Sequence, residues 1–282
     1  MHLLDLFTLP FMRHALIAVI LVGVTCAVLG TYVVLRRMAF VGDAMAHTAM
    51  PGLVVAYLYG WSLFLGALVA DCLAALGIGA LSRRRDIRED TAIGILFTGM
   101  FALGVVLMTH TRSFRDLTDM LLGNILTITD ADLVRMAIVA AVVLTTLALL
   151  HKELELTSFD PGYAQVIGLK TSITRLVLLL LLAATVVVGI AVVGVVLTSA
   201  LLVTPAATAS LLTRRLTTIM FWSALFAIAS GIAGLYLSLT LDLSCGAGIV
   251  LVCTAFFVIV YLGRSLLSLR RVNPSPLGSG PA

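Results

Sequence analysis

The chain of 282 residues is 61% hydrophobic and only 11% charged, with a mean hydropathy of +1.16. A soluble domain needs roughly a quarter of its residues charged, so this composition excludes a soluble protein. The net charge of +4 does not indicate nucleic-acid binding, because the basic residues stand in short clusters between apolar runs, as topology determinants of membrane proteins do.

Apolar runs cover nearly the whole chain and predict an all-α, polytopic transmembrane bundle. About 20 apolar residues cross the hydrocarbon core as a helix. We expect one transmembrane domain over residues 1–272 and a disordered tail at 273–282, which is rich in proline and glycine. Nine spans are predicted, or eight, at 15–35, 39–59, 62–81, 91–110, 133–150, 173–193, 195–213, 218–239 and 246–262.

Two of the predicted spans contain a proline, Pro51 in the second and Pro205 in the seventh. A proline inside a helix has no N–H to donate, so we expect these helices to kink or break there. Both prolines are candidates for residues along a transport pathway.

The distribution of basic residues predicts the orientation. Alternating spans put 14 of the 18 Lys and Arg residues on one side. The positive-inside rule makes that side cytoplasmic, which gives an external N-terminus and a cytoplasmic C-terminus in a bacterial inner membrane.

Asp43 and His47 are the most informative polar residues within a span. They are four apart, so on a helix they share one face. A carboxylate and an imidazole form half of a site that manganese, iron or zinc accepts. The alternative is an intrahelical hydrogen bond that only packs the bundle. Asp43 stands about four residues into the predicted span. Either the span begins deeper, or the pair controls the inner part of a path.

Five sequence elements occur in an order that resembles the ABC-3 family of metal-type ABC permeases. They cover residues 36–215, with compatible hydropathy to residue 262. The elements are Gly42-Asp43-Ala44-x-x-His47-x-x-x-Pro51-Gly52, EDTAIGI at 89–95, LLGNIL at 121–126, Phe159-Asp160-Pro161-x-x-Ala164-x-x-x-Gly168 and ALLVTPAATA at 200–209.

This resemblance implies a homodimer with the type II importer fold of the vitamin B12 permeases. It also implies two cytoplasmic ABC ATPase subunits and an external metal-binding protein as partners. Asp43 and His47 would then meet their symmetry mates and supply four ligands to the transported ion. The Met50-Pro51-Gly52 ending is closer to manganese and iron members than to zinc members, so manganese is favoured, with iron and zinc as alternatives.

Residues 158–169 predict a short helix in the longest cytoplasmic loop. Asp160 suits the N-cap, Pro161 the first helical position and Gly168 the C-terminal stop. The resemblance implies that this is the coupling helix, which contacts the ATPase; an ordinary surface helix is the alternative. The positions implied in coupling are Phe159, Asp160, Pro161, Ala164 and Gly168.

The chain itself lacks a nucleotide-binding loop. Five residues separate Gly162 from Gly168, and Leu169 precedes Lys170, whereas a P-loop needs four residues and an immediate lysine. We expect no catalytic residues here and ATP hydrolysis in a separate partner.

Asp71 lies mid-way along the third span and should not face lipid. A role in the pathway or in proton movement and a hydrogen-bonded structural role are both open.

The sequence therefore predicts the permease subunit of an ATP-driven importer of divalent transition metals, working by alternating access. The alternative is an ATP-independent secondary carrier. Such carriers commonly contain internal repeats with broken helices in matching positions. No convincing repeat surrounds Pro51 and Pro205.

Overall fold

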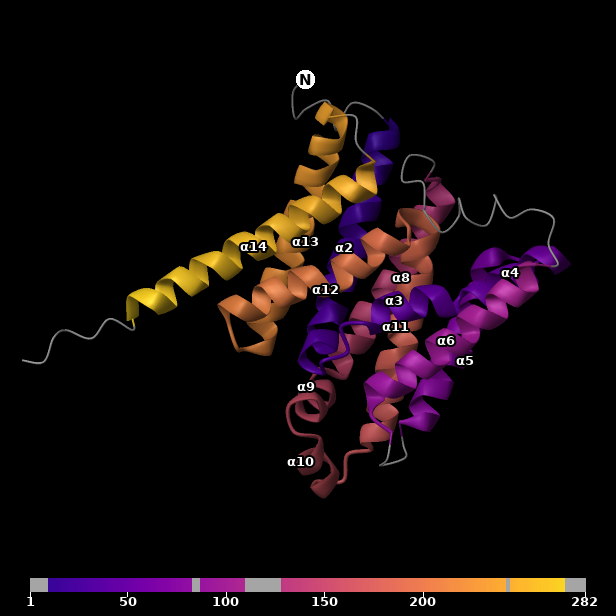
Figure 1. Ribbon diagram of the computed structural model, residues 1–282, viewed down its shortest axis with the longest axis horizontal. Coiled ribbons are helices and arrows are strands. Elements are labelled where there is room, and N and C mark those ends of the chain that lie inside the picture. Colours follow the sequence, from indigo (N-terminus) through magenta and orange to yellow (C-terminus); the bar gives the residue numbers. More distant parts are fainter. Residues whose placement is uncertain (1–9, 83–86, 110–127, 242–243, 272–282) are drawn as a thin grey trace, which may run out of the picture.

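The computed structural model describes residues 10–82, 87–109, 128–241 and 244–271, and these ranges contain helices and no strands (Figure 1). Eight of the helices are long and apolar enough to cross a membrane. They are α2 (Pro10–Leu35), α5 (Leu63–Leu81), α6 (Glu89–Met108), α8 (Asp130–Leu149), α11 (Thr171–Val193), α12 (Val195–Leu212), α13 (Leu216–Leu241) and α14 (Cys245–Arg271). The LLGNIL element and the predicted tail lie outside the described residues.

The second predicted span is two short helices, α3 (Val41–Thr48) and α4 (Met50–Tyr59), which meet at Ala49. Neither helix is long enough to cross a bilayer alone. Pro51 has no N–H to donate to the His47 carbonyl four residues back, which accounts for a break at this point. The expected interruption is therefore present at Pro51. At Pro205, in contrast, α12 continues as one helix.

The core forms where the long helices pack around α2, which lies along α12 and α13 near the centre of the bundle (Figure 1). Gly30 of α2 lets the two backbones touch, because a side chain there would collide with the Leu202 carbonyl of α12. On the other side, α5 packs against α4, α6 and α11. Without a hydrophobic drive between helices in lipid, such close contacts of small residues hold a membrane bundle together.

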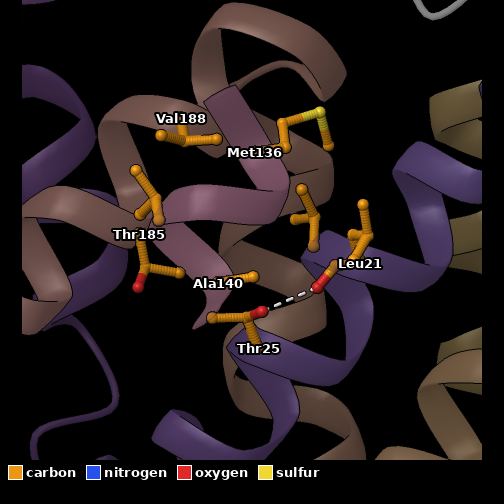
Figure 2. A pocket seen from close by; sticks show the side chains of 8 residues that line it. Leu21, Thr25, Met136, Ala140, Thr185 and Val188 are labelled. Carbon is orange, nitrogen blue, oxygen red and sulfur yellow. Dashed lines mark hydrogen bonds between the residues drawn. The ribbon is translucent and has the colours of Figure 1, made fainter. Parts of the chain in front are cut away.

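A small cavity lies between α2, α8 and α11 (Figure 2). Its volume is about 10 Å³, which is room for no more than one water. Its lining is apolar except for the hydroxyls of Thr25 and Thr185, which donate to the Leu21 and Leu181 carbonyls of their own helices. The cavity therefore offers neither the space nor the free ligands that an ion would need.

Candidate functional site

Asp43 and His47 lie on one face of α3, as their spacing predicts. Asp43 Oδ1 is 4.0 Å from His47 Nε2, and the two side chains are 44% and 30% exposed. A separation of 4.0 Å is too long for a hydrogen bond. The intrahelical hydrogen bond that the sequence left open is thus not formed, and both side chains have an accessible surface.

Packing, rather than hydrogen bonding, orients the His47 ring. Phe97 and Phe101 of α6 present their rings to it edge-on, with centroids 5.6 and 5.4 Å away. The Nδ1 atom is buried and has no hydrogen-bond partner among the described residues. Phe40 in turn packs against Phe97 at 5.5 Å. This leaves Nε2 as the ring nitrogen on the side of Asp43.

The sequence analysis did not predict the contacts of Phe97 and Phe101 with His47. The available signal was the four-residue spacing of Phe97 and Phe101 on the fourth span, which puts both rings on one helix face. That spacing alone does not say which residue the rings contact.

Asp43 and His47 are the third and seventh residues of α3, which begins at Val41. After α2 the chain turns back sharply, with Arg37 at φ 58° and the Met38 N–H bonded to the Val33 carbonyl. His47 contacts Phe97, the ninth residue of α6, which is about 12 Å from the start of that helix. His47 therefore lies about as far along the bundle as its place in the predicted span indicates, eight residues after residue 39.

The described residues of one chain do not form a complete metal site. Within the described ranges, no group of three or more His, Cys, Asp or Glu residues is placed to hold a metal ion. Asp43 and His47 would provide two ligands, fewer than the four to six that divalent metals take.

Asp71 is fully buried on α5 and faces α3. Its Oδ1 atom is 2.7 Å from Thr48 Oγ1. Asp71 therefore contacts the residue after His47 rather than joining the exposed pair. Pro51 and Pro205 are both buried. Pro51 packs where α4 meets α6, since a side chain at Gly104 would lie 3.3 Å from its Cδ.

The segment with the predicted coupling role forms α9 (His151–Phe159) and α10 (Pro161–Val166). The Asp160 carboxylate caps α10 by accepting from the Tyr163 N–H at 2.9 Å, and Gly168 takes the positive φ of 86° that ends the turn. Ala164 is buried. Several apolar side chains are instead exposed: Phe159 by 55%, Tyr163 by 55%, Val166 by 84% and Ile167 by 50%.

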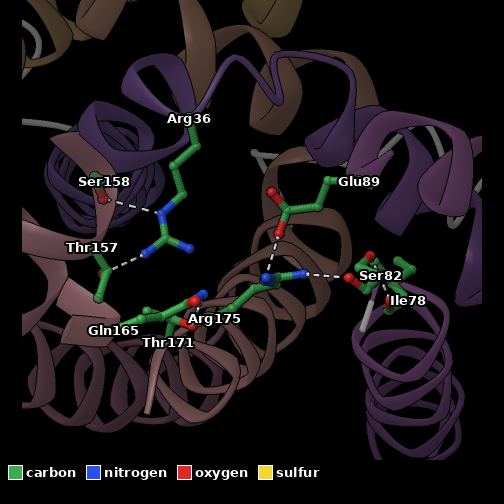
Figure 3. Close-up of polar contacts among 9 residues, drawn as sticks. All are labelled: Arg36, Ile78, Ser82, Glu89, Thr157, Ser158, Gln165, Thr171 and Arg175. Carbon is green, nitrogen blue, oxygen red and sulfur yellow. Dashed lines mark hydrogen bonds and ion pairs between the residues drawn. The ribbon is translucent and has the colours of Figure 1, made fainter. Parts of the chain in front are cut away.

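Two arginines attach this segment and its neighbours to the bundle (Figure 3). Arg36, just after α2, donates to Thr157 Oγ1 at 2.9 Å and Ser158 Oγ at 3.0 Å. Burial lowers the pKa of Arg36, and the Glu89 carboxylate opposes that change. Arg175 of α11 donates to the Ser82 carbonyl at 3.0 Å, and its Nε is 2.9 Å from Glu89 Oε1.

These contacts also show how the chain crosses the bundle. The ends of α2 and α5 and the start of α6 all lie at the end that carries α9 and α10 (Figure 3). Because α2 and α5 both finish there, the chain between them must return to the opposite end. The broken pair α3 and α4 makes that crossing, in addition to the eight long helices.

Comparison with known proteins identifies the family. The ABC 3 transport family matches residues 8–264. The chain is 42% identical to the manganese transport system membrane protein MntC of Halalkalibacterium halodurans, over 91% of this chain and 88% of that protein. It is 39% identical to the probable iron transport system membrane protein of Haemophilus influenzae, over 91% of this chain and 95% of that protein.

Solved structures show the same architecture. PsaBC from Streptococcus pneumoniae in complex with Fab contains a chain that is 33% identical, with a TM-score of 0.82 over 95% of this chain and 98% of that one. An inward-facing metal-chelate type ABC transporter shares the fold at 16% identity, with a TM-score of 0.72 over 92% of this chain and 88% of that one.

These findings confirm the predicted all-helical type II importer fold and the prediction of a transport permease that is not itself an ATPase. Because the family matches nearly the whole chain and the relatives are similar over almost their full length, the chain belongs to the ABC 3 transport family.

Proposed function

We propose that the chain is the membrane-spanning permease of an ATP-driven importer whose cargo is manganese or iron. Relatives of 42% and 39% identity over 91% of the chain bear the names of manganese and iron systems. Manganese is the first choice, because the most similar of these relatives is named for it and because the chain carries the Met50-Pro51-Gly52 ending. Zinc is an alternative cargo, because a carboxylate and an imidazole also bind zinc.

The observation that carries the metal assignment is the exposed Asp43 and His47 pair on α3. Its two side chains are 4.0 Å apart and both partly accessible. A carboxylate and an imidazole suit manganese, iron and zinc alike. Two ligands do not enclose an ion, so we propose that a second copy of the chain brings its own pair across a two-fold axis.

The exposed apolar residues of α9 and α10 are the proposed docking surface for a cytoplasmic ABC ATPase, one on each copy of the permease. Phe159 and Val166 are 55% and 84% exposed in a chain segment that lies outside the long helices. Their end of the bundle carries Arg36 and Arg175, and in the sequence three arginines directly follow Ser82. The positive-inside rule makes this end cytoplasmic, with the N-terminus outside and the C-terminus inside.

ATP binding by the partner would move α9 and α10, tilt the bundle about the two-fold axis and expose the Asp43 and His47 layers to one side at a time. An external metal-binding protein would deliver the ion. No cofactor is needed in this chain, since the metal is cargo and ATP acts in the partner.

An ATP-independent carrier is the weaker proposal. The family to which the chain belongs is an ABC transport family, and no internal repeat relates the broken span at Pro51 to the unbroken α12 at Pro205.

The test is uptake of manganese, iron and zinc by cells that carry the intact system, with Asp43→Ala and His47→Ala compared with wild type. Asp90→Ala, at an exposed carboxylate at the start of α6, is the matched control. We expect both pair variants to lose uptake of the cargo metal while membrane insertion and ATPase assembly stay normal. Normal uptake in both would reduce the pair to helix packing.

A further inference from the structure

Asp71 is the one acidic residue that is completely buried in the described part of the chain. Its Oδ1 atom is 2.7 Å from Thr48 Oγ1, and its Oδ2 atom is buried without a hydrogen-bond partner among the described residues. An ionised carboxylate in such surroundings is expensive unless it is paired or fully hydrogen-bonded. A carboxyl group that keeps its proton avoids most of that cost.

The hydrogen bonds of Thr48 also favour a protonated, neutral Asp71. The Thr48 hydroxyl has two acceptors in reach, Asp71 Oδ1 at 2.7 Å and the Met45 carbonyl at 3.0 Å. A hydroxyl has one proton, so it makes one two-centre bond or shares that proton in a weaker three-centre bond. Both contacts are two-centre hydrogen bonds if Asp71 is neutral and donates to Thr48, which then donates to Met45.

This chain of bonds ends at the last turn of α3. The Met45 carbonyl receives the Ala49 N–H at 3.3 Å, close to the break between α3 and α4. The Thr48 hydroxyl supplies a second, shorter bond to that carbonyl. Thr48 directly follows His47. The hydrogen bond between Thr48 and Asp71 therefore sets how far the last turn of α3 is rotated about the helix axis.

The neighbouring helices hold the other side of the break. A side chain at Gly52 would lie 2.7 Å from Ala70 Cβ, one residue before Asp71. A side chain at Gly104 of α6 would lie 2.9 Å from Met50 Cβ. The start of α4 is thus fixed by backbone packing, whereas the end of α3 is fixed to α5 by the Asp71–Thr48 bond.

We propose that Asp71, as a neutral carboxyl group, is a positioning residue for the ion site: through Thr48 it holds His47 against Phe97 and Phe101 with Nε2 beside Asp43. This inference rests on the proposed function of the Asp43 and His47 pair. It assigns Asp71 to the binding of the ion in place of a role as a proton carrier.

The test is the concentration dependence of manganese uptake in cells with the complete transporter. Asp71→Asn keeps an uncharged hydrogen-bond donor. Asp71→Leu keeps the approximate size of the side chain but removes the donor. Thr48→Ser and Thr48→Val form the corresponding pair on α3. We expect the Asn and Ser variants to retain the wild-type KM, and the Leu and Val variants to raise KM about tenfold with little change in maximal rate.

The double variant Asp71→Leu with Thr48→Val should be no worse than either single variant, because both remove one shared bond. Membrane content and basal ATP hydrolysis are measured for every variant, so that a variant that fails to insert is recognised. If an Asp71 variant fails to insert, the comparison of Thr48→Ser with Thr48→Val tests the inference.

Two results would overturn the inference. A loss of maximal rate in Asp71→Asn would mean that the acid itself takes part in transport, as a proton carrier does. An unchanged KM in Asp71→Leu and Thr48→Val at normal membrane content would mean that the bond does not position the site. Failure of the proposed function looks different, because Asp43→Ala would then transport normally.

Discussion

The Glu89 carboxylate at the start of α6 lies against the Arg175 guanidinium of α11, with Oε1 2.9 Å from Nε. The same guanidinium donates to the Ser82 carbonyl, which follows α5. The Arg175 and Glu89 side chains are only 22% and 27% exposed, so solvent screens their attraction less than that of a surface pair. One side chain thus connects three helices at the end of the bundle that carries α9 and α10.

Replacing this arginine should loosen that end. We expect Arg175→Gln to lower the free energy of unfolding by about 2 kcal/mol, because the partly buried Glu89 loses its charged partner. Thermal unfolding of the purified complex in detergent measures the effect. Glu89→Gln is the partner variant, and the double variant should cost less than the two single costs added together. Additive costs would show that the two groups do not interact.

The Gly52 position should not tolerate a side chain. A methyl group there would collide with the Gly66 carbonyl and lie 2.7 Å from Ala70 Cβ. We expect Gly52→Ala to cost about 2 kcal/mol or more through overpacking. Gly263→Ala on α14 is the control, since nothing lies within 4 Å of the added methyl group. That control should be neutral or slightly stabilising. Equal thermal stability of the two variants would contradict the observed contact between α4 and α5.

Pro51→Ala should change transport more than stability. The new N–H can donate to the His47 carbonyl and allow α3 and α4 to join into a straighter helix. Because His47 lies in the last turn of α3, we expect the metal KM of uptake to rise severalfold while thermal stability is kept or increased. Pro205→Ala is a useful comparison, because α12 is already one helix there. A wild-type KM in Pro51→Ala would show that the break does not set the position of His47.

A charge on α10 should weaken ATPase docking. Val166 is 84% exposed, and Val166→Asp would place a carboxylate that loses its water when a partner covers it. We expect co-purification of the ATPase and metal uptake to fall by at least tenfold, with normal insertion of the permease. Trp61→Asp is the control, because Trp61 is 66% exposed and lies between α4 and α5, outside the long helices. Undiminished co-purification would exclude Val166 from the interface.

Local signals predicted much of the fold. Runs of apolar residues located the eight long helices, and the chemistry of Pro51 predicted the interruption of the second span. Asp160, Pro161 and Gly168 marked the ends of the short helical turn α10, because capping and positive φ depend on adjacent residues. The separate helix α9, which follows α8 after one non-helical residue, was not predicted.

The surroundings of the candidate site could not be predicted in the same way. Asp71 and Thr48 are 23 positions apart, and Arg36 and Ser158 are 122 apart. Such contacts depend on how helices pack, and many polar residues could pair equally well along a sequence. The face shared by Asp43 and His47 followed from their spacing, whereas the aromatic rings around His47 depend on how α3 packs against α6.

The contact between Gly52 and Gly66 also bears on how the protein is made. α4 has ten residues and reaches about 15 Å, half the thickness of the hydrocarbon core. During synthesis such a segment has little tendency to leave the translocon for lipid by itself. Its backbone fits closely against that of α5, the next helix to emerge. We expect the two to enter the bilayer together as a hairpin, so that α5 acts as the insertion partner of α4, which begins two residues after Thr48.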